Sequence, residues 1–111
     1  MKGYTNNDEE VARFAKALGH PARIVILKFL ASQPSCYFGE LNDIIPLTKA
    51  TVSQHLTELK DSGLIMGQFE PPKVRYCINK DNWERAKELL LSMFDSYNEK
   101  QSICCKGNSE L

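Results

Sequence analysis

Four cysteines stand out as the chemically distinctive residues of this 111-residue chain: Cys36, Cys77 and the adjacent pair Cys104 and Cys105. The adjacent pair lies in a polar tail, residues 101–111, where packing offers no evident reason for two thiols. Thiolates are preferred ligands of soft ions. Cys104 and Cys105 are therefore candidate ligands for a soft trivalent ion such as arsenite, As(III), which takes three thiolates. Cys36 is the candidate third ligand.

Other interpretations of these cysteines remain open. Cys36 is equally consistent with a small buried side chain, and Cys77, on the strand face with Lys73 and Arg75, is expected to be incidental. The four residues lack the paired CxxC spacing of a structural zinc site. The chain has neither an apolar run near the about 18 residues that span a membrane nor a signal-peptide core at its start. A cytoplasmic protein with no membrane contact is expected, and its cysteines would be reduced there.

A catalytic site is not expected. The two histidines, His20 and His55, have no nucleophile and orienting carboxylate at a suitable spacing. His55 is expected to pack beside an apolar stripe and to donate one hydrogen bond to the backbone. Because the chain also lacks a glycine-rich phosphate loop and a paired-carboxylate signature, we expect neither enzyme activity nor a required cofactor.

Residues 39–56 predict a helix-turn-helix, a layout typical of DNA-binding proteins. Pro46 ends the first helix, because proline lacks an amide hydrogen and clashes with the preceding turn. Thr48 can cap the second helix through its hydroxyl. Apolar residues at helical spacing define the first helix, Phe38, Leu41, Ile44 and Ile45, and the core side of the second, Val52, Leu56 and Leu59.

The opposite face of the second helix is short, polar and almost uncharged. It carries Ala50, Gln54 and Thr57, flanked by Thr51 and Ser53. Such a face suits the major groove, where Gln pairs with an adenine edge and Ser or Thr bonds bases or phosphates. A simply solvated helix surface is the alternative. The predicted DNA contacts are Lys49, Ala50, Thr51, Ser53, Gln54 and Thr57, with Lys73 and Arg75 from the segment that follows.

That segment predicts a β-hairpin. Gly63 closes the second helix, since glycine enters the left-handed region freely, and two extended runs follow at residues 64–69 and 73–78. In the second run, apolar Val74, Tyr76 and Ile78 alternate with Lys73, Arg75 and Cys77. A helix-turn-helix followed by a two-stranded ribbon is a winged helix.

The chain resembles the ArsR/SmtB family of bacterial winged-helix repressors. The resemblance is carried by Ala17-Leu18-Gly19-His20-Pro21-Ala22-Arg23, Gly39-Glu40-Leu41, Thr51-Val52-Ser53-Gln54-His55-Leu56 and Ser62-Gly63-Leu64-Ile65. It implies a homodimer formed by the first and last helices, and soft-metal sensing by cysteines near the helix-turn-helix or the last helix. The chain departs from the family at its single Cys36, where a Cys-x-Cys motif is usual, and at Pro71-Pro72, which predict a stiffer wing tip.

Apolar stripes near both chain ends also favour a dimer. Val11, Phe14, Ala15 and Leu18 follow an acidic first turn, and a last helix capped by Asp81 or Asn82 carries large apolar residues to Tyr97. Together they exceed what a small winged helix must bury. The predicted interface is Phe14, Leu18, Trp83, Leu90, Met93, Phe94 and Tyr97, although packing within the monomer is the alternative.

Charge is balanced overall, with 14 basic and 14 acidic residues, although phosphate contacts usually require a basic excess. Between residues 48 and 80 the balance is five basic to three acidic, so we expect modest DNA affinity.

We predict an α+β, mainly helical, winged helix-turn-helix of about five helices and a two-stranded wing, with the domain at 1–100 and a cysteine-containing tail at 101–111. The predicted function is a homodimeric repressor on a pseudo-palindromic DNA operator, released by arsenite or a similar thiol-seeking metalloid. A redox sensor, a regulator without a ligand and a winged helix used for protein interaction are the alternatives.

Overall fold

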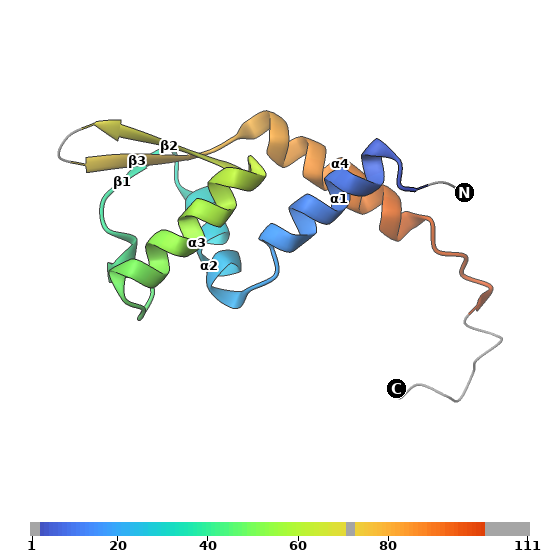
Figure 1. The fold of residues 1–111 in the computed structure, drawn as a ribbon, viewed down its shortest axis with the longest axis horizontal. Helices are drawn as coiled ribbons and strands as arrows, with labels where there is room; N and C mark the ends of the chain where they lie inside the picture. Colours follow the sequence, from blue (N-terminus) through green and yellow to red (C-terminus); the bar gives the residue numbers. More distant parts are fainter. Residues whose placement is uncertain (1–2, 71–72, 102–111) are drawn as a thin grey trace.

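The fold is shown in Figure 1, a computed structural model that describes residues 3–70 and 73–101. Within these residues the chain forms four α-helices, one 3-10 turn and three strands. In order they are α1 (Asn6–Ala17), α2 (Pro21–Ser32), β1 (Tyr37–Phe38), η1 (Leu41–Asp43), α3 (Lys49–Ser62), β2 (Ile65–Glu70), β3 (Lys73–Ile78) and α4 (Lys80–Asp95). The predicted mainly helical winged helix-turn-helix is confirmed, with differences in three elements.

The first helix of the predicted helix-turn-helix is reduced to η1, a single 3-10 turn. Leu41 and Ile45 are buried as expected, but Phe38 belongs to β1 and is exposed. Gly39 interrupts the segment with a φ of +144°, and Pro46 closes it. The few residues between Gly39 and Pro46 cannot offset the cost of nucleating an α-helix, so the prediction of about five helices is wrong here.

The last helix begins earlier than predicted. Asn79 is its N-cap, and the Asn79 side chain accepts a hydrogen bond from the amide of Asn82 at 3.2 Å. Asn82 is therefore inside the helix, and its own side-chain amide donates to the carbonyl of Gly63 at 2.9 Å. Gly63 has a φ of +88° and ends α3 in the left-handed conformation, as predicted. The Asn82 bond thus joins the start of α4 to the end of α3.

The strand β1 adds a third member to the predicted two-stranded wing. The sheet order is β1-β3-β2, and both pairings are antiparallel. Tyr37 lies opposite Tyr76, and Phe38 lies opposite Arg75. Because directly opposed residues share one side of a sheet, the tyrosines form an inner row, packed against the core. Phe38 and Arg75 form a row on the outer side.

The hydrophobic core joins α1, α2, α3 and the inner side of the sheet. Its largest fully buried side chains are Phe14, Ile26 and Leu59. Phe14 was predicted to contribute to a dimer interface, but it has no exposed surface in the single chain. Phe14 lies in the last turn of α1, where this helix packs against the core. A partner chain therefore cannot contact its side chain.

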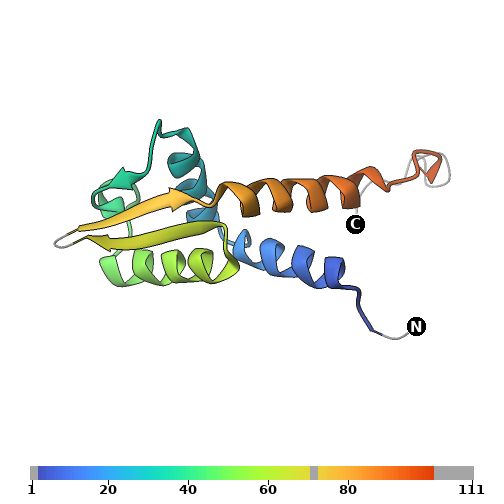
Figure 2. The same cartoon turned by 90° about the horizontal axis from the view of Figure 1, so that it is seen from above.

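The helices α1 and α4 lie side by side and project from the body of the protein, forming an arm (Figures 1 and 2). The Arg85 guanidinium joins them by binding the Glu10 carboxylate at 2.9 Å and the side-chain oxygen of Asn7 at 3.1 Å. The Arg85 hydrogen bond lowers the pKa of Glu10. The helices α1 and α4 are therefore held together within the single chain, without any contribution from a second chain.

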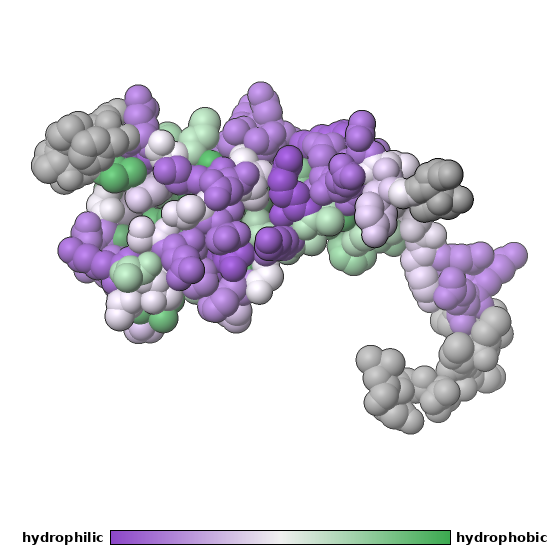
Figure 3. Space-filling view, viewed as in Figure 1, coloured by the Kyte–Doolittle hydropathy of each residue, from purple (hydrophilic) through white to green (hydrophobic). Residues whose placement is uncertain are grey.

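Large apolar side chains remain exposed near the end of this arm. Leu91, Met93, Phe94 and Tyr97 are 50%, 47%, 66% and 55% exposed. In Figure 3 a green, apolar strip follows the lower edge of the arm beneath purple, hydrophilic side chains. Tyr97 lies beyond the helix, which ends at Asp95. The predicted apolar stripe of the last helix did not include Leu89. The structure buries Leu89 and Ala86 of α4.

Candidate nucleic-acid interface

The two faces of α3 differ as the sequence predicts. Val52, Leu56 and Leu59 are buried in the core. Along the opposite face, the predicted contact residues are exposed to solvent: Lys49, Ala50, Ser53, Gln54 and Thr57. The structure therefore brings five of the eight predicted DNA contacts together on one accessible helix face.

Thr51 is positioned differently from these five. It is half-buried, and its hydroxyl accepts a hydrogen bond from the Thr48 hydroxyl at 2.9 Å. Its backbone amide donates to the Thr48 side chain at 3.2 Å. This pair caps the N-terminus of α3, so Thr51 serves the helix start as well as the face.

Lys49 forms an exposed ion pair with Glu40, with 3.6 Å between Nζ and Oε1. Exposed pairs of this kind contribute little stability. The Lys49 ammonium can therefore exchange the carboxylate for a phosphate at small cost. Glu40 belongs to the segment before η1, so the pair also links the two parts of the helix-turn-helix.

A histidine and an arginine set the position of α3. His55 is buried, and its Nδ1 accepts a hydrogen bond from Arg23 Nε at 3.1 Å. Arg23 also donates to the carbonyls of Lys16 and Ala17 at the end of α1. The His20 ring lies against the His55 ring in a tilted arrangement, with 4.3 Å between ring centroids and 49° between the ring planes. Arg23 thus ties α1 and α2 to the middle of α3.

This arrangement confirms a structural role for His55 but corrects its partner. The sequence predicted donation to the backbone, whereas the ring accepts from a side chain. Burial lowers the pKa of His55, and the nearby His20 and Arg23 lower it further. A neutral ring is what the Arg23 hydrogen bond requires, because a protonated Nδ1 could not accept it. Sequence reasoning missed Arg23, since no local pattern marks a contact across 32 residues.

The wing residue Arg75 is less available for DNA contact than predicted. The Arg75 side chain is half-buried on the outer side of the sheet, where it hydrogen-bonds Gln68 of β2 and lies over the Phe38 ring, 5.9 Å from its centroid. The Lys73 side chain and Pro71-Pro72 at the tip lie outside the residues whose placement is described. A phosphate contact by Arg75 would have to use the guanidinium while it remains held against the sheet.

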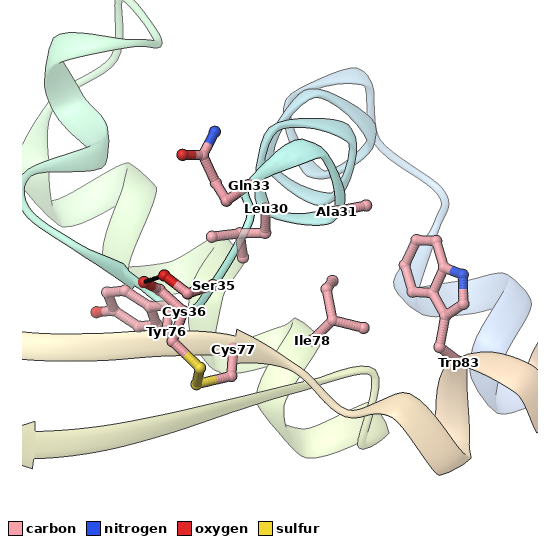
Figure 4. Close-up of a pocket in the computed structure, with 9 residues that line it drawn as sticks. All are labelled: Leu30, Ala31, Gln33, Ser35, Cys36, Tyr76, Cys77, Ile78 and Trp83. Carbon is pink, nitrogen blue, oxygen red and sulfur yellow. Dashed lines mark hydrogen bonds between the residues drawn. A yellow bond between two sulfur atoms is a disulfide. The ribbon is translucent and has the colours of Figure 1, made fainter.

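The cysteines are arranged differently from the prediction. Cys36 and Cys77 form a disulfide, with 4.5 Å between their Cα atoms (Figure 4). The expectations that all four cysteines are reduced and that Cys77 is incidental are therefore wrong. β1 brings the two together across 41 residues. Cys104 and Cys105 lie outside the described residues.

Cys36 and Cys77 are also among the residues that line a pocket of about 330 Å³ between α2, the sheet and the start of α4. Figure 4 shows the bonded sulfurs beside β3, with Leu30 and Gln33 of the α2 end and Trp83 of α4 around the hollow. In the described part of the chain, no group of three or more His, Cys, Asp or Glu side chains is placed to hold a metal ion. A complete arsenite site is therefore not formed by the described residues.

Residues 20–66, which span α2 to the start of β2, match the family described as bacterial regulatory protein, arsR family. The chain is 37% identical over 73 residues to the HTH-type transcriptional regulator YgaV of Escherichia coli strain K12, covering 66% of this chain and 74% of that protein. This chain belongs to the arsR family.

Two further relatives support this assignment to the arsR family. The biofilm growth-associated repressor of Agrobacterium fabrum is 33% identical over 85 residues, covering 77% of this chain and 72% of the repressor. The NMR structure of the cadmium metal-sensor CMTR from Mycobacterium tuberculosis has 37% identity and a TM-score of 0.53, covering 68% of this chain and 77% of that one.

The arsR-family chain is thus a DNA-binding transcriptional regulator and not an enzyme. The predicted resemblance is confirmed. None of the helices described is both long enough and apolar enough to cross a membrane.

Proposed function

We propose that the protein is a cytoplasmic, homodimeric repressor in which α3 of each subunit enters the major groove of a pseudo-palindromic operator. The exposed face of α3 carries this proposal, because Gln54, Ser53 and Thr57 project from a helix whose other side is buried. Short polar side chains on such a face suit the reading of base edges. Lys49 and the wing residues Lys73 and Arg75 would contact the phosphate backbone.

Selection from random duplexes should recover a pseudo-palindromic sequence, and binding to it should weaken as salt is raised. The slope of log affinity against log salt should be shallow, since only Lys49, Lys73 and Arg75 of each subunit are proposed to contact phosphates. Fluorescence anisotropy at several salt concentrations measures both quantities. A winged helix used for protein interaction would instead show no salt-dependent duplex binding, and that result would overturn the proposal.

Arsenite is the proposed effector, with Cys104 and Cys105 binding first and Cys36 completing the three-thiolate shell. Soft-ion sensing is supported by the relative whose structure is that of a cadmium metal-sensor. Cys36 is bonded to Cys77 in the structure, so this shell requires the disulfide to be reduced first. Because Cys36 precedes β1 and η1, its movement toward the tail would displace the segment that leads into α3.

In an operator-release titration under reducing conditions, arsenite should release wild-type protein at lower concentration than the Cys104→Ser/Cys105→Ser variant. A tenfold rise in operator dissociation requires As(III) to bind the DNA-free form about 1.4 kcal/mol more tightly. Equal release curves would remove the arsenite proposal and leave the repressor proposal intact.

The Cys36–Cys77 disulfide favours a second candidate effector, an oxidant. Disulfides in reducing compartments are usually transient and redox-sensing. Hydrogen peroxide would take two electrons and two protons from the two thiols, so that their sulfurs join in a disulfide and the peroxide becomes two waters. In an operator-binding assay with hydrogen peroxide in place of the reductant, the wild-type protein should change its operator affinity and the Cys77→Ser variant should not, whereas the variant's arsenite response under reducing conditions should persist.

A further inference from the structure

A row of three sulfur-containing side chains crosses the outer side of the sheet. Continuing the β1 and β3 register by one residue beyond Tyr37 and Tyr76 places Cys36 opposite Cys77. Their Cα separation of 4.5 Å is typical of directly opposed residues in a narrow antiparallel pair. The two sulfurs are therefore brought together by strand pairing, and they stay neighbours when the bond between them is broken.

Met66 is the third member of the row. It lies opposite Cys77 in the pairing of β2 with β3, and directly opposed residues have Cβ atoms about 4.5 to 5.5 Å apart on the same side of the sheet. Met66 is 49% exposed, so its thioether can turn toward Cys77 without breaking core packing. We call Cys36, Cys77 and Met66 the sulfur row.

The charge around the sulfur row suits a monovalent ion. Two thiolates and one monovalent cation leave a net charge of minus one. Arg75 is two residues from Cys77 on β3 and so on the same side of the sheet, in the next row, over Phe38. A nearby guanidinium favours the thiolate form of cysteine and balances that remaining charge.

Donor chemistry selects the kind of ion. Thiolate and thioether ligands together favour soft ions such as Cu(I). Zinc prefers thiolate, imidazole and carboxylate ligands, and the described residues place no group of three such side chains together. Arsenite takes three thiolates, of which the row has two.

We propose that the sulfur row, once its disulfide is reduced, binds a soft monovalent cation of the Cu(I) and Ag(I) class. A dithiol reductant supplies two electrons and two protons, so that the Cys36–Cys77 bond breaks, two thiols form and the reductant becomes a disulfide. The cation then displaces both thiol protons and binds the two thiolates and the Met66 thioether. The disulfide and the metal site are thus alternative states of one cysteine pair.

The test is an anaerobic titration of Cu(I) against a chromophoric Cu(I) chelator, with the full chain carrying Cys104→Ser and Cys105→Ser to remove the tail thiols. The reduced protein should take one Cu(I) per chain from the chelator, and the same protein with its disulfide intact should take none. Cys36→Ser or Cys77→Ser should abolish binding. The assay contains no DNA, so its outcome is independent of the proposed function.

Met66→Leu distinguishes the three-sulfur site from a simple pair of thiols. Loss of an outer-shell partner lowers metal affinity by about tenfold or more. Loss of the Met66 thioether, a direct ligand, should therefore lower the Cu(I) affinity by at least that factor. Val25→Ala is the control, since Val25 is similarly exposed at 45% but lies on α2, and the Cu(I) affinity of this variant should equal that of the parent. Reduced protein that leaves all Cu(I) with the chelator would overturn the proposal, as would equal affinities for the Met66 variant and the parent.

Discussion

Replacing Phe94 with aspartate should produce a monomer that binds the operator at least about 100-fold more weakly, because linking two half-site contacts in one molecule raises affinity by that order. Phe94 is 66% exposed at the end of α4, beside exposed Leu91 and Met93. Contiguous exposed apolar surface of this kind normally marks a partner surface. An aspartate there would have to be buried without a counter-ion in the dimer, whereas in the monomer it meets water.

Analytical ultracentrifugation at micromolar concentration and operator anisotropy measure the two effects. The control is Glu84→Ala, which changes an exposed residue of α4 outside the apolar strip and should leave the dimer intact. The Phe94→Asp variant should retain the helical content and the unfolding midpoint of the wild-type monomer, since Phe94 lies outside the core. A wild-type protein that sediments as a monomer would remove the argument for a dimer.

Replacing Gln54 with alanine should cost about 1 to 3 kcal/mol of binding free energy on the correct operator and relax base preference at one position in each half-site. The Gln54 side chain is exposed on α3, where its amide can both donate to and accept from an adenine edge. Anisotropy with the selected operator and with its single-base variants provides the measurement.

Lys49→Ala is the matched comparison on the same face. Its loss should weaken binding to all sequences evenly and flatten the salt dependence, because a phosphate contact carries no base information. Gln54→Ala should leave the salt slope nearly unchanged. If Gln54→Ala alters neither affinity nor base preference, α3 does not read the groove through this residue.

Local signals in the sequence predicted most of the helical framework. Thr48 and Gly63 bound α3 as expected, since a hydroxyl cap and a left-handed glycine act within a few residues of their own position. The 3.6-residue spacing of Val52, Leu56 and Leu59 placed the core side of that helix, and therefore its exposed side. The alternation along β3 likewise put Tyr76 on the inner side of the sheet and Cys77 on the outer side.

Elements that depend on distant partners were missed. β1 has two residues, too few for any periodicity, and it exists because β3 offers it hydrogen-bonding partners. The expected helix after it is reduced to η1 for a local reason instead, since Gly39 and Pro46 leave too few residues between them to nucleate an α-helix. The Arg23 contact with His55 also left no local trace.

The sequence by itself therefore determined the winged helix, the faces of α3 and the candidate contact residues, because each follows from short-range backbone preferences and periodic burial. Only the tertiary structure decided the state of Cys36 and Cys77. Strand pairing brought Cys36 to Cys77 and set Met66 beside them, and packing of α1 against the core buried Phe14 within the monomer. Those outcomes depend on which segments meet in space, and the register of a two-residue strand is set by its partner rather than by its own residues.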